Sequence, residues 1–445
     1  MEFINKYIFG AGVPIFLFSV AIMLIITLSG KPFVHPIRTV RGMFSKKRSG
    51  GVSPIKAVLL ALAGTLGVGN IVGVASAIAL GGAGAVFWMW ISAIFAMILK
   101  YAEAALAVSH RRYRNGESYG GAMYYMKDAF DRQEKPMRAL IFPSVFALLC
   151  IVNAFSVGCV IQSNAVSESF HGIMGVPRWL VGVLIAIFAG IVFFGRGKRI
   201  FSAAASLVPA VSVIYIVMSV IVIVNGADRI PQILSDIFGE AFSLSSAAGG
   251  AAGFLLSRGL RYGTIRGLLS NEAGCGTAPI AHAASNTDSP AEQGFLGMLE
   301  VFVDTIVLCT MTAFVILLNM DASMAFADDP IMMAFAAFSQ TLGGTSEVLL
   351  CISVLLFAFA TIICWGYYGK ECVYFFTKSK KHQTLYFAAY TAFAFLGSIT
   401  SMGGVWQIAD LSIGGMTLMN LFVLCKMRGE IKDITLSYFK KRTRN

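Results

Sequence analysis

The chain has 445 residues, of which 57% are hydrophobic and only 13% are charged, and its mean hydropathy is +0.75. A soluble domain carries roughly 25% charged residues, so this composition excludes a water-soluble protein and indicates that lipid covers much of the chain. The net charge of +12 does not indicate nucleic acid, because the basic residues lie mainly in loops between apolar runs, as in the cytoplasmic loops of membrane proteins.

Apolar runs follow one another along the chain with short polar breaks. A span needs about 20 apolar residues, and on that rule we predict eleven transmembrane helices in one domain over residues 1–445. They lie near residues 12–29, 54–81, 84–109, 139–171, 178–194, 203–226, 243–266, 293–319, 345–376, 384–400 and 404–426. The first run lacks a basic leader and a cleavage site, so we expect a retained span.

Loop charges orient these spans. Every second loop is basic, including Arg258, Arg261 and Arg266 at the end of the seventh span. The opposite side carries two acidic loops, which contain Asp228, Asp236, Glu240, Asp321, Asp328 and Asp329. The alternation fits eleven spans and predicts an outside N-terminus and a cytoplasmic C-terminus.

Two spans contain glycine clusters. The second span carries GTLGVGNIVG at residues 64–73, and the seventh carries GGAAGF at 249–254. Each cluster weakens the helix at mid-span, since each Gly costs about 1 kcal/mol relative to Ala. Both spans begin a group of five, one over residues 54–226 and one over 243–426. Because five is odd, the second group starts from the opposite side of the membrane, which predicts an inverted repeat with a broken helix in each half.

Broken helices free backbone groups that can bind ions and substrate. Freed carbonyls and half-helix C-termini can hold sodium, and freed N–H groups can hold a carboxylate. Close helix packing through pairs such as Gly69 and Gly73 is the alternative explanation of the first cluster. A dinucleotide-binding loop is excluded, because the spacing is wrong and no strand precedes it.

Several motifs resemble the alanine/glycine:cation symporter family. The cluster at 64–73 is followed by ALGG at 79–82, FWMW at 87–90, KYAEA at 100–104, YGGAMYY at 119–125, RGLLSNEAGCGTAP at 266–279 and WGYYG at 365–369. The resemblance covers nearly the whole chain after the first span. It implies an all-α integral membrane protein with a LeuT-type five-plus-five inverted repeat, one extra N-terminal helix, and sodium-coupled uptake of alanine or glycine.

Four side chains are candidates for the walls of the site. Gln162 is an amide inside the apolar fourth span, and the family pattern supports a hydrogen bond to the bound amino acid; an interhelical clasp is the alternative. Thr361 and Trp365 share one face of the ninth span at i and i+4. The resemblance places Thr361 in a sodium site with carbonyls of the first broken helix. Trp365 would wall the pocket or pack in the core, and Phe254 is the matching aromatic on the other broken helix.

Three intramembrane acids, Glu103, Glu300 and Asp304, are candidate gating residues. Glu300 and Asp304 lie one turn apart, and we expect a structural or gating ion pair with Arg258, Arg261 or Arg266. Residues 270–285 are interpreted as a loop. None of the eight cysteines forms a CxxC pair, and no His/Cys spacing suits zinc, so the cysteines are interpreted as core residues.

These features together predict a symporter with alternating access. Sodium would bind Gly64, Thr65, Gly67 and Thr361. The substrate carboxylate would meet N–H groups near Gly69 and Asn70, and its ammonium the carbonyls near Gly250 and Gly253, with Gln162, Phe254 and Trp365 around them.

Three rivals remain open. The first is a proton-coupled amino-acid transporter that uses the buried acids, and the second is a channel. The third is an intramembrane enzyme, for which the five histidines offer no constellation. We expect no cofactor beyond sodium as coupling ion, no nucleic-acid partner, a monomer, and a bacterial inner-membrane location.

Overall fold

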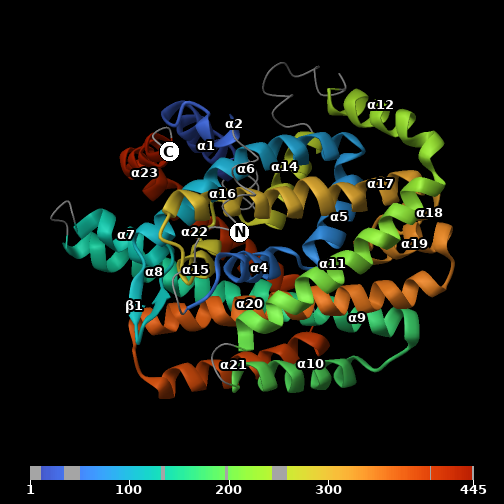
Figure 1. Cartoon of the computed structure of the whole chain (residues 1–445). Coiled ribbons are helices and arrows are strands. Elements are labelled where there is room, and N and C mark those ends of the chain that lie inside the picture. The colour runs from blue at the N-terminus through green and yellow to red at the C-terminus, as the bar shows by residue number, and fades with distance from the viewer. Residues whose placement is uncertain are drawn as a thin grey trace.

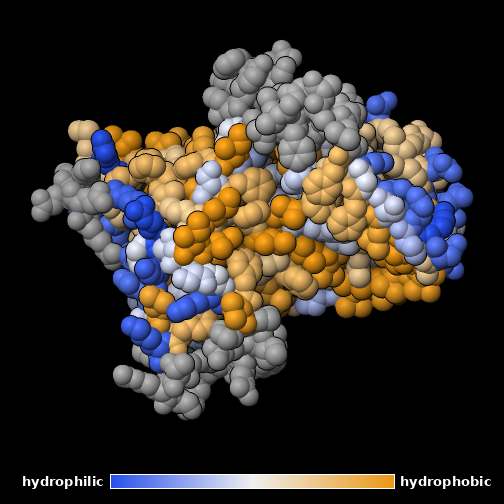
Figure 2. All heavy atoms as spheres, turned by 90° about the horizontal axis from the view of Figure 1, so that it is seen from above, coloured by the Kyte–Doolittle hydropathy of each residue, from blue (hydrophilic) through white to orange (hydrophobic). Residues whose placement is uncertain are grey.

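The computed structural model describes residues 12–34, 51–131, 136–195, 199–242, 258–400 and 402–442. Most of these residues are helical, and strands β1 (Arg112–Arg114) and β2 (Glu117–Tyr119) form a short antiparallel hairpin. The long helices run side by side across the molecule (Figure 1). Figure 2 shows hydrophilic side chains gathered at two ends and a broad hydrophobic surface between them, as expected of a protein embedded in a bilayer.

The described part of the first half of the chain carries a broken helix, three long apolar spans and the shorter apolar helix Arg178–Phe193. Its helices are α1 (Val13–Thr27), α2 (Lys31–Val34), α4 (Pro54–Thr65), α5 (Val74–Gly81), α6 (Gly84–Ser109), α7 (Ala122–Asp131), α8 (Pro136–Phe155), α9 (Gln162–Met174), α10 (Arg178–Phe193), α11 (Arg199–Asn225) and α12 (Ile230–Ala241). A π-helical turn at Ser156–Ile161 joins α8 to α9, and a 3-10 turn at Ala227–Arg229 leads into α12.

The described part of the second half of the chain is also helical. Its helices are α14 (Arg258–Asn271), α15 (Ala278–Ala283), α16 (Pro290–Val301), α17 (Thr310–Leu318), α18 (Met320–Met324), α19 (Pro330–Leu342), α20 (Thr345–Phe376), α21 (Lys380–Ile399), α22 (Gly403–Lys426) and α23 (Arg428–Arg442). A π-helical segment at Phe302–Cys309 joins α16 to α17.

Within the described part of the chain, six helices are long and apolar enough to cross a membrane, or seven with the bent pair α4–α5. The six are Gly84–Ser109, Met137–Met174, Arg199–Asn225, Pro290–Leu318, Thr345–Phe376 and Gly403–Lys426. Val13–Thr27 and Arg178–Phe193 are shorter apolar helices. The multi-pass membrane architecture is confirmed, whereas the count of eleven stays a prediction.

Some helices expose apolar side chains to lipid, whereas others are buried inside the protein. α10 and α11 expose large apolar side chains such as Ile187, Phe188 and Val213, which suit contact with acyl chains. α20 lies at the centre instead, and Trp365 and Tyr368 are among its fully buried side chains. It packs against α4, α8, α9 and α11, so it connects both halves of the chain.

The first glycine cluster breaks its helix as predicted. α4 ends at Thr65, a π-helical turn spans Gly69–Gly73, and the chain continues into α5 with a bend of 53°. The second predicted cluster, with Gly250, Gly253 and Phe254, lies outside the described residues.

A second break does occur, but further along than the sequence predicted. α14 continues past residue 266 to Asn271, and α15 begins at Ala278. Between them Gly274 and Gly276 adopt positive φ angles of 82° and 79°, which favour glycine. Pro279 then stands in the first turn of α15, where proline is well tolerated. The interpretation of residues 270–285 as a loop was therefore wrong for the end of α14 and for α15, whereas residues 272–277 between them are not helical.

The sequence also misplaced the arginines of the seventh span. The backbone amide of Gly84, at the start of α6, donates to Glu240 of acidic helix α12 at 3.3 Å. A Cβ at Gly259 would lie 3.4 Å from the carbonyl oxygen of Gly81. The first turn of α14 therefore lies at the same end as α12, and not at the opposite end as the loop charges predicted.

His110 holds the other end of α6. Its Nδ1 lies 2.7 Å from Asp128 of α7, and its Nε2 lies 2.7 Å from Glu430 of α23. Burial opposes protonation of the ring, but the hydrogen bonds to both carboxylates outweigh it, so the pKa of His110 is raised. This cluster ties the C-terminal helix to the body of the protein.

Candidate functional site

The break between α4 and α5 brings three predicted residues together. A Cβ at Gly67 would lie only 2.8 Å from Oγ1 of Thr361 and 3.2 Å from Oε1 of Gln162. The amide of Val68, left without a helical partner, donates to Gln162 Oε1 at 3.3 Å. The unwound backbone thus lies directly against α9 and α20, and only glycine fits at position 67.

Thr361 contacts the broken helix through its hydroxyl. Oγ1 donates to the carbonyl of Ala63 at 2.9 Å or to that of Phe357, one turn back, at 3.1 Å. Thr361 is 1% exposed. Gly64 also faces α20, since a Cβ there would lie 3.0 Å from Cys364 Sγ. Thr361 therefore contacts the end of α4, whereas the sodium site predicted there stays a prediction.

Trp365, one turn further along α20, reaches the second break. Its indole N–H donates to Oε1 of Glu272 at 3.1 Å, and Thr277 donates to Oε2 of the same carboxylate at 2.7 Å. Gly158 makes room for the ring, because a Cβ there would lie 2.1 Å from Trp365 Cβ. Trp365 is 1% exposed and does not line the cavity described next.

A cavity of about 340 Å³ lies between the two breaks. Gly64, Thr65, Gly67, Val68 and Gly69 line it from the first break, Ser270 and Glu272 from the second, and Gln162 from α9. It extends toward Asp329, Trp406 and Asp410. Its volume is within the usual range for small-molecule sites, and polar residues line it both at the breaks and beyond them, where Asn164, Arg266, Asp329 and Asp410 lie.

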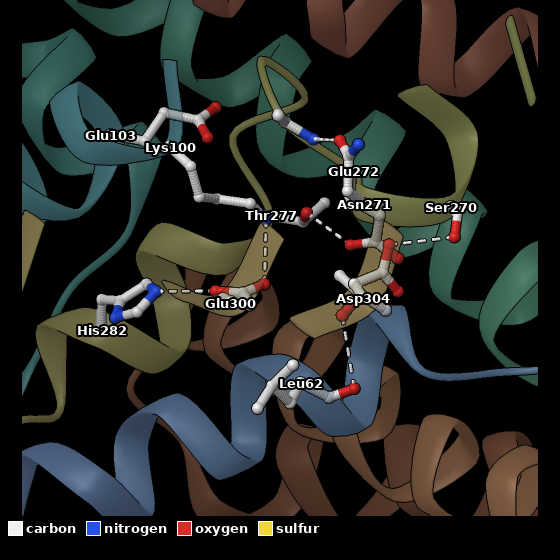
Figure 3. Close-up of polar contacts among 12 residues, drawn as sticks. Leu62, Lys100, Glu103, Ser270, Asn271, Glu272, Thr277, His282, Glu300 and Asp304 are labelled. Carbon is white, nitrogen blue, oxygen red and sulfur yellow. Dashed lines mark hydrogen bonds and ion pairs between the residues drawn. The ribbon is translucent and has the colours of Figure 1, made fainter. Parts of the chain in front are cut away.

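Asn70 faces away from this cavity. Its Nδ2 donates to Asp304 Oδ1 at 2.8 Å, and Asn70 is absent from the cavity lining. Ser270 donates to Asp304 Oδ2 at 3.0 Å, as does Thr305 at 2.8 Å. Figure 3 shows Asp304 and Ser270 close together beside Glu272. The contact of the Asn70 backbone with substrate stays a prediction, whereas the Asn70 side chain is hydrogen-bonded to Asp304.

The acids Glu103 and Glu300 have partners that the sequence did not predict. Glu300 pairs with Lys100 at 3.0 Å and with His282 at 3.0 Å, and all three side chains are 0% exposed (Figure 3). The partners of Glu300 are therefore Lys100 and His282 and not Arg266, while the side chains of Arg258 and Arg261 lie outside the described part of the structure. Glu103 accepts from the amide of Gly276 at 2.9 Å and from Asn420 at 2.6 Å.

Sequence reasoning therefore missed the second break as a source of site residues. Glu272 is buried, lines the cavity and anchors Trp365. A signal was present: the spacing of Gly274 and Gly276, with Pro279 after them, is typical of a helix that ends and restarts. The sequence analysis placed the second break at the glycines of residues 249–254 instead.

Comparison with known proteins places these features in context. The model of the sodium:alanine symporter family matches residues 1–445. The sodium/alanine symporter AgcS of Methanococcus maripaludis is 34% identical over 98% of this chain and 96% of its own. The probable sodium/glutamine symporter GlnT of Bacillus subtilis is 36% identical over 87% of this chain and 79% of its own.

Solved structures share the fold at low identity. MhsT in complex with L-phenylalanine has a TM-score of 0.53 and 14% identity, over 85% of this chain and 90% of that one. A manganese transporter of Eremococcus coleocola has a TM-score of 0.52 and 13% identity, over 83% and 76%. These likenesses support the predicted LeuT-like transporter fold.

Proposed function

This chain belongs to the sodium:alanine symporter family, and on that premise we propose that it couples inward sodium movement to uptake of alanine or glycine by alternating access. Family membership establishes a membrane transporter for cation-coupled amino-acid symport, and not an enzyme. The observation that carries the finer proposal is the small cavity that two broken helices and Gln162 line.

Sodium would bind where Thr361 meets the end of α4. The Thr361 hydroxyl oxygen and the Ala63 carbonyl oxygen lie 2.9 Å apart. If the hydrogen bond between them opened slightly, both oxygens could coordinate the same cation. Carbonyls at Gly64, Thr65 and Gly67 would complete the shell, because sodium prefers hard oxygen donors and the C-terminal end of a half-helix is partly negative.

The amino acid would lie in the cavity beside this ion. Its carboxylate would accept from backbone amides near Gly69 and Asn70, where the half-helix leading to α5 begins. The carbonyls predicted for the ammonium lie outside the described residues. Within the described part, Glu272 places a carboxylate at the cavity wall, and we assign the ammonium to it. Gln162 would bond the substrate from the α9 side.

Sodium coupling follows from this arrangement. The bound ion would hold the freed carbonyls of α4 against α20 and so fix the adjacent N–H groups that meet the substrate. An ordered site binds more tightly, because the cost of ordering has already been met. By reciprocity, the substrate would raise the affinity for sodium by the same factor.

Uptake into proteoliposomes tests the proposal. Purified protein should accumulate radiolabelled alanine when an inward sodium gradient is imposed, and should not when potassium replaces sodium. Thr361→Val should weaken activation by sodium, whereas Thr361→Ser keeps the hydroxyl and should retain it. Uptake that is indifferent to the replacement of sodium by potassium would refute sodium coupling.

A proton-coupled transporter is the second candidate. The buried acid Asp304 forms no ion pair with another described residue, and such a group can carry a proton. A relative from Bacillus subtilis, 31% identical over 86% of this chain and 80% of its own, is named a putative sodium/proton-dependent alanine carrier. Alanine uptake driven by an inward proton gradient without sodium would favour this candidate.

A further inference from the structure

A second cavity lies between the β1–β2 hairpin and the C-terminal end of α20, on the side that the basic loops predict to be cytoplasmic. Its volume is about 540 Å³, and we call it the hairpin cavity. Arg114 and Glu117 line it from the hairpin, and Lys370 and Glu371 line it from α20. Figure 1 shows the hairpin beside that end of α20. Glu117 is exposed, whereas Glu371 is only 1% exposed, so the cavity leads from the protein surface to a buried carboxylate. A cavity of this size is large enough for a small molecule.

Two helices lead from the substrate cavity proposed above to the hairpin cavity. Gly64, near the end of α4, lines the substrate cavity, and Val52, just before the start of α4, lines the hairpin cavity. Glu272, before α15, lines the substrate cavity, and Ala284, directly after α15, lines the hairpin cavity. α4 and α15 pack against each other. A substrate that leaves along these two helices would therefore enter the hairpin cavity next.

The buried carboxylate of Glu371 has a partner for only one of its two oxygens. Oε1 accepts from the ammonium of Lys370, whereas Oε2 has no hydrogen-bond partner among the described residues. A buried polar atom without a partner is costly, and native structures contain few of them. Because Glu371 lines the hairpin cavity, an ammonium group in that cavity would satisfy Oε2. This atom therefore indicates a ligand with a positively charged donor.

The guanidinium of Arg114 brings the opposite charge to the same cavity. It lies over the ring of Tyr374, 4.2 Å from the ring centre, and Tyr374 is one turn along α20 from Glu371. Among the described residues no carboxylate lies within ion-pair distance of Arg114, in contrast to Arg112, which pairs with Asp128 at 2.6 Å. A guanidinium can bind a carboxylate through two parallel hydrogen bonds. Arg114 and Glu371 thus present opposite charges to one cavity without pairing with each other.

We propose that the hairpin cavity is a release site that binds the transported amino acid as a zwitterion, an inference that rests on the uptake proposed above. The ammonium would donate to Oε2 of Glu371, and the carboxylate would accept from Arg114. An α-amino acid carries both charges on one carbon, so it fits two opposite charges that share a small space. The chain itself supplies both of these charges, so binding here needs no sodium, unlike binding at the broken helices. Amino acid that accumulates inside the cell would occupy this site and slow further release.

Equilibrium dialysis of radiolabelled alanine against the purified full-length protein tests this site directly. The wild type should bind two alanine molecules per chain in sodium and one in potassium, because only the substrate cavity depends on sodium. Glu371→Gln keeps the size of the side chain and removes its charge, and it should weaken alanine binding in potassium about tenfold. Gln162→Ala changes the substrate cavity alone, so alanine binding in potassium should persist. Glu347→Gln, a carboxylate change in the first turn of α20 outside both cavities, should bind alanine as the wild type does.

Competition against alanine bound in potassium identifies the chemistry of the ligand. Propionate lacks the ammonium and alanine methyl ester lacks the carboxylate, so each should compete about tenfold more weakly than alanine. Propionate that competes as well as alanine would indicate an anion site at Arg114 and would overturn the inference. Alanine methyl ester that competes as well as alanine would indicate a cation site at Glu371, and this result would overturn it too.

The outcomes separate this inference from the proposed function. Alanine binding in sodium but none in potassium would refute the release site and leave sodium symport standing. Alanine binding in potassium that Glu371→Gln abolishes, in a protein whose uptake is indifferent to sodium, would support the site and refute sodium coupling. Arg114→Gln covers the possibility that Glu371→Gln does not fold, because Arg114 is half-buried and lies in the hairpin. It should weaken alanine binding in potassium about tenfold, and an unchanged affinity would overturn the inference.

Discussion

The buried Lys100–Glu300 pair offers a quantitative test of the packing between α6 and α16. The ammonium and carboxylate lie 3.0 Å apart, and both side chains are 0% exposed. Removing one partner of such a pair costs about 3–5 kcal/mol, because the other charge stays buried without compensation, whereas removing both is often near neutral. The two single substitutions should differ, because Glu300 has a second partner in His282 at 3.0 Å.

We therefore expect Glu300→Gln to be the most damaging change, with a loss near the full 3–5 kcal/mol. Lys100→Met should cost less, because Glu300 keeps its contact with His282 Nε2 at 3.0 Å. The double variant Lys100→Met/Glu300→Gln should recover most of the loss, since neither member of the pair is left buried without the other.

Thermal melting in detergent, followed by size-exclusion chromatography of the surviving monodisperse protein, gives this order. Large proteins often unfold irreversibly, so the rank order of the melting midpoints is the readout rather than an equilibrium free energy. The expected order is wild type, double variant, Lys100→Met, then Glu300→Gln. A double variant no more stable than Glu300→Gln would refute the reasoning, because it would show that lost packing, and not an unpaired charge, sets the cost.

Three further predictions follow from single contacts. Gly67→Ala would place a Cβ 2.8 Å from Thr361 Oγ1; overpacking costs about 1–3 kcal/mol, so sodium-activated uptake should need about tenfold more sodium. Trp365→Phe removes the hydrogen bond to Glu272, worth about 1.5–3 kcal/mol for a charged partner, and should lower the melting midpoint and the alanine uptake rate. His110 has a raised pKa because its two carboxylate hydrogen bonds outweigh burial, so its stabilising effect is full below the ordinary histidine pKa of about 6.5 and is lost as pH rises through the raised value. The difference in melting midpoint between wild type and His110→Gln should therefore shrink between pH 6 and pH 9.

Matched comparisons make these three tests decisive. Gly172→Ala in α9 meets only Met332 Sδ at 3.9 Å, so it should leave the sodium dependence unchanged; an equal effect at both glycines would contradict the steric argument. Trp365→Phe with wild-type stability and uptake would show that the indole N–H contributes nothing. A His110→Gln difference that grows with pH would reverse the expected sign.

Part of the site could be predicted from local sequence. The run at 64–73 is a cluster of poor helix formers within an apolar segment. Such a cluster interrupts the helix because of its own residues, whatever packs around it. The i, i+4 spacing put Thr361 and Trp365 on one face of α20 before any fold was known. Gln162 was conspicuous because an amide in an apolar span needs a partner. In the structure Gly67, Gln162 and Thr361 do meet at the break.

The second break shows how a local signal can be outweighed by another. The glycines at 249–254 matched the mid-span position expected of an inverted repeat, so the interruption at residues 272–277 was interpreted as a loop. In the structure that segment is held by distant groups. Glu103 accepts from the Gly276 amide, and Asn420 donates to the Gly274 carbonyl at 2.9 Å. Such contacts stabilise an unwound backbone in a membrane, and they cannot be inferred from the segment itself.

The sequence alone determined the class of protein, the place of the first break and the family, because hydropathy, glycine spacing and motifs are properties of short stretches of chain. Only the tertiary structure decided which polar groups meet inside the bundle. Lys100 meets Glu300 across 200 residues, Asn70 meets Asp304 across 234, and Trp365 meets Glu272 across 93. These partners depend on how helices cross and rotate against one another, and that is set by packing over the whole domain.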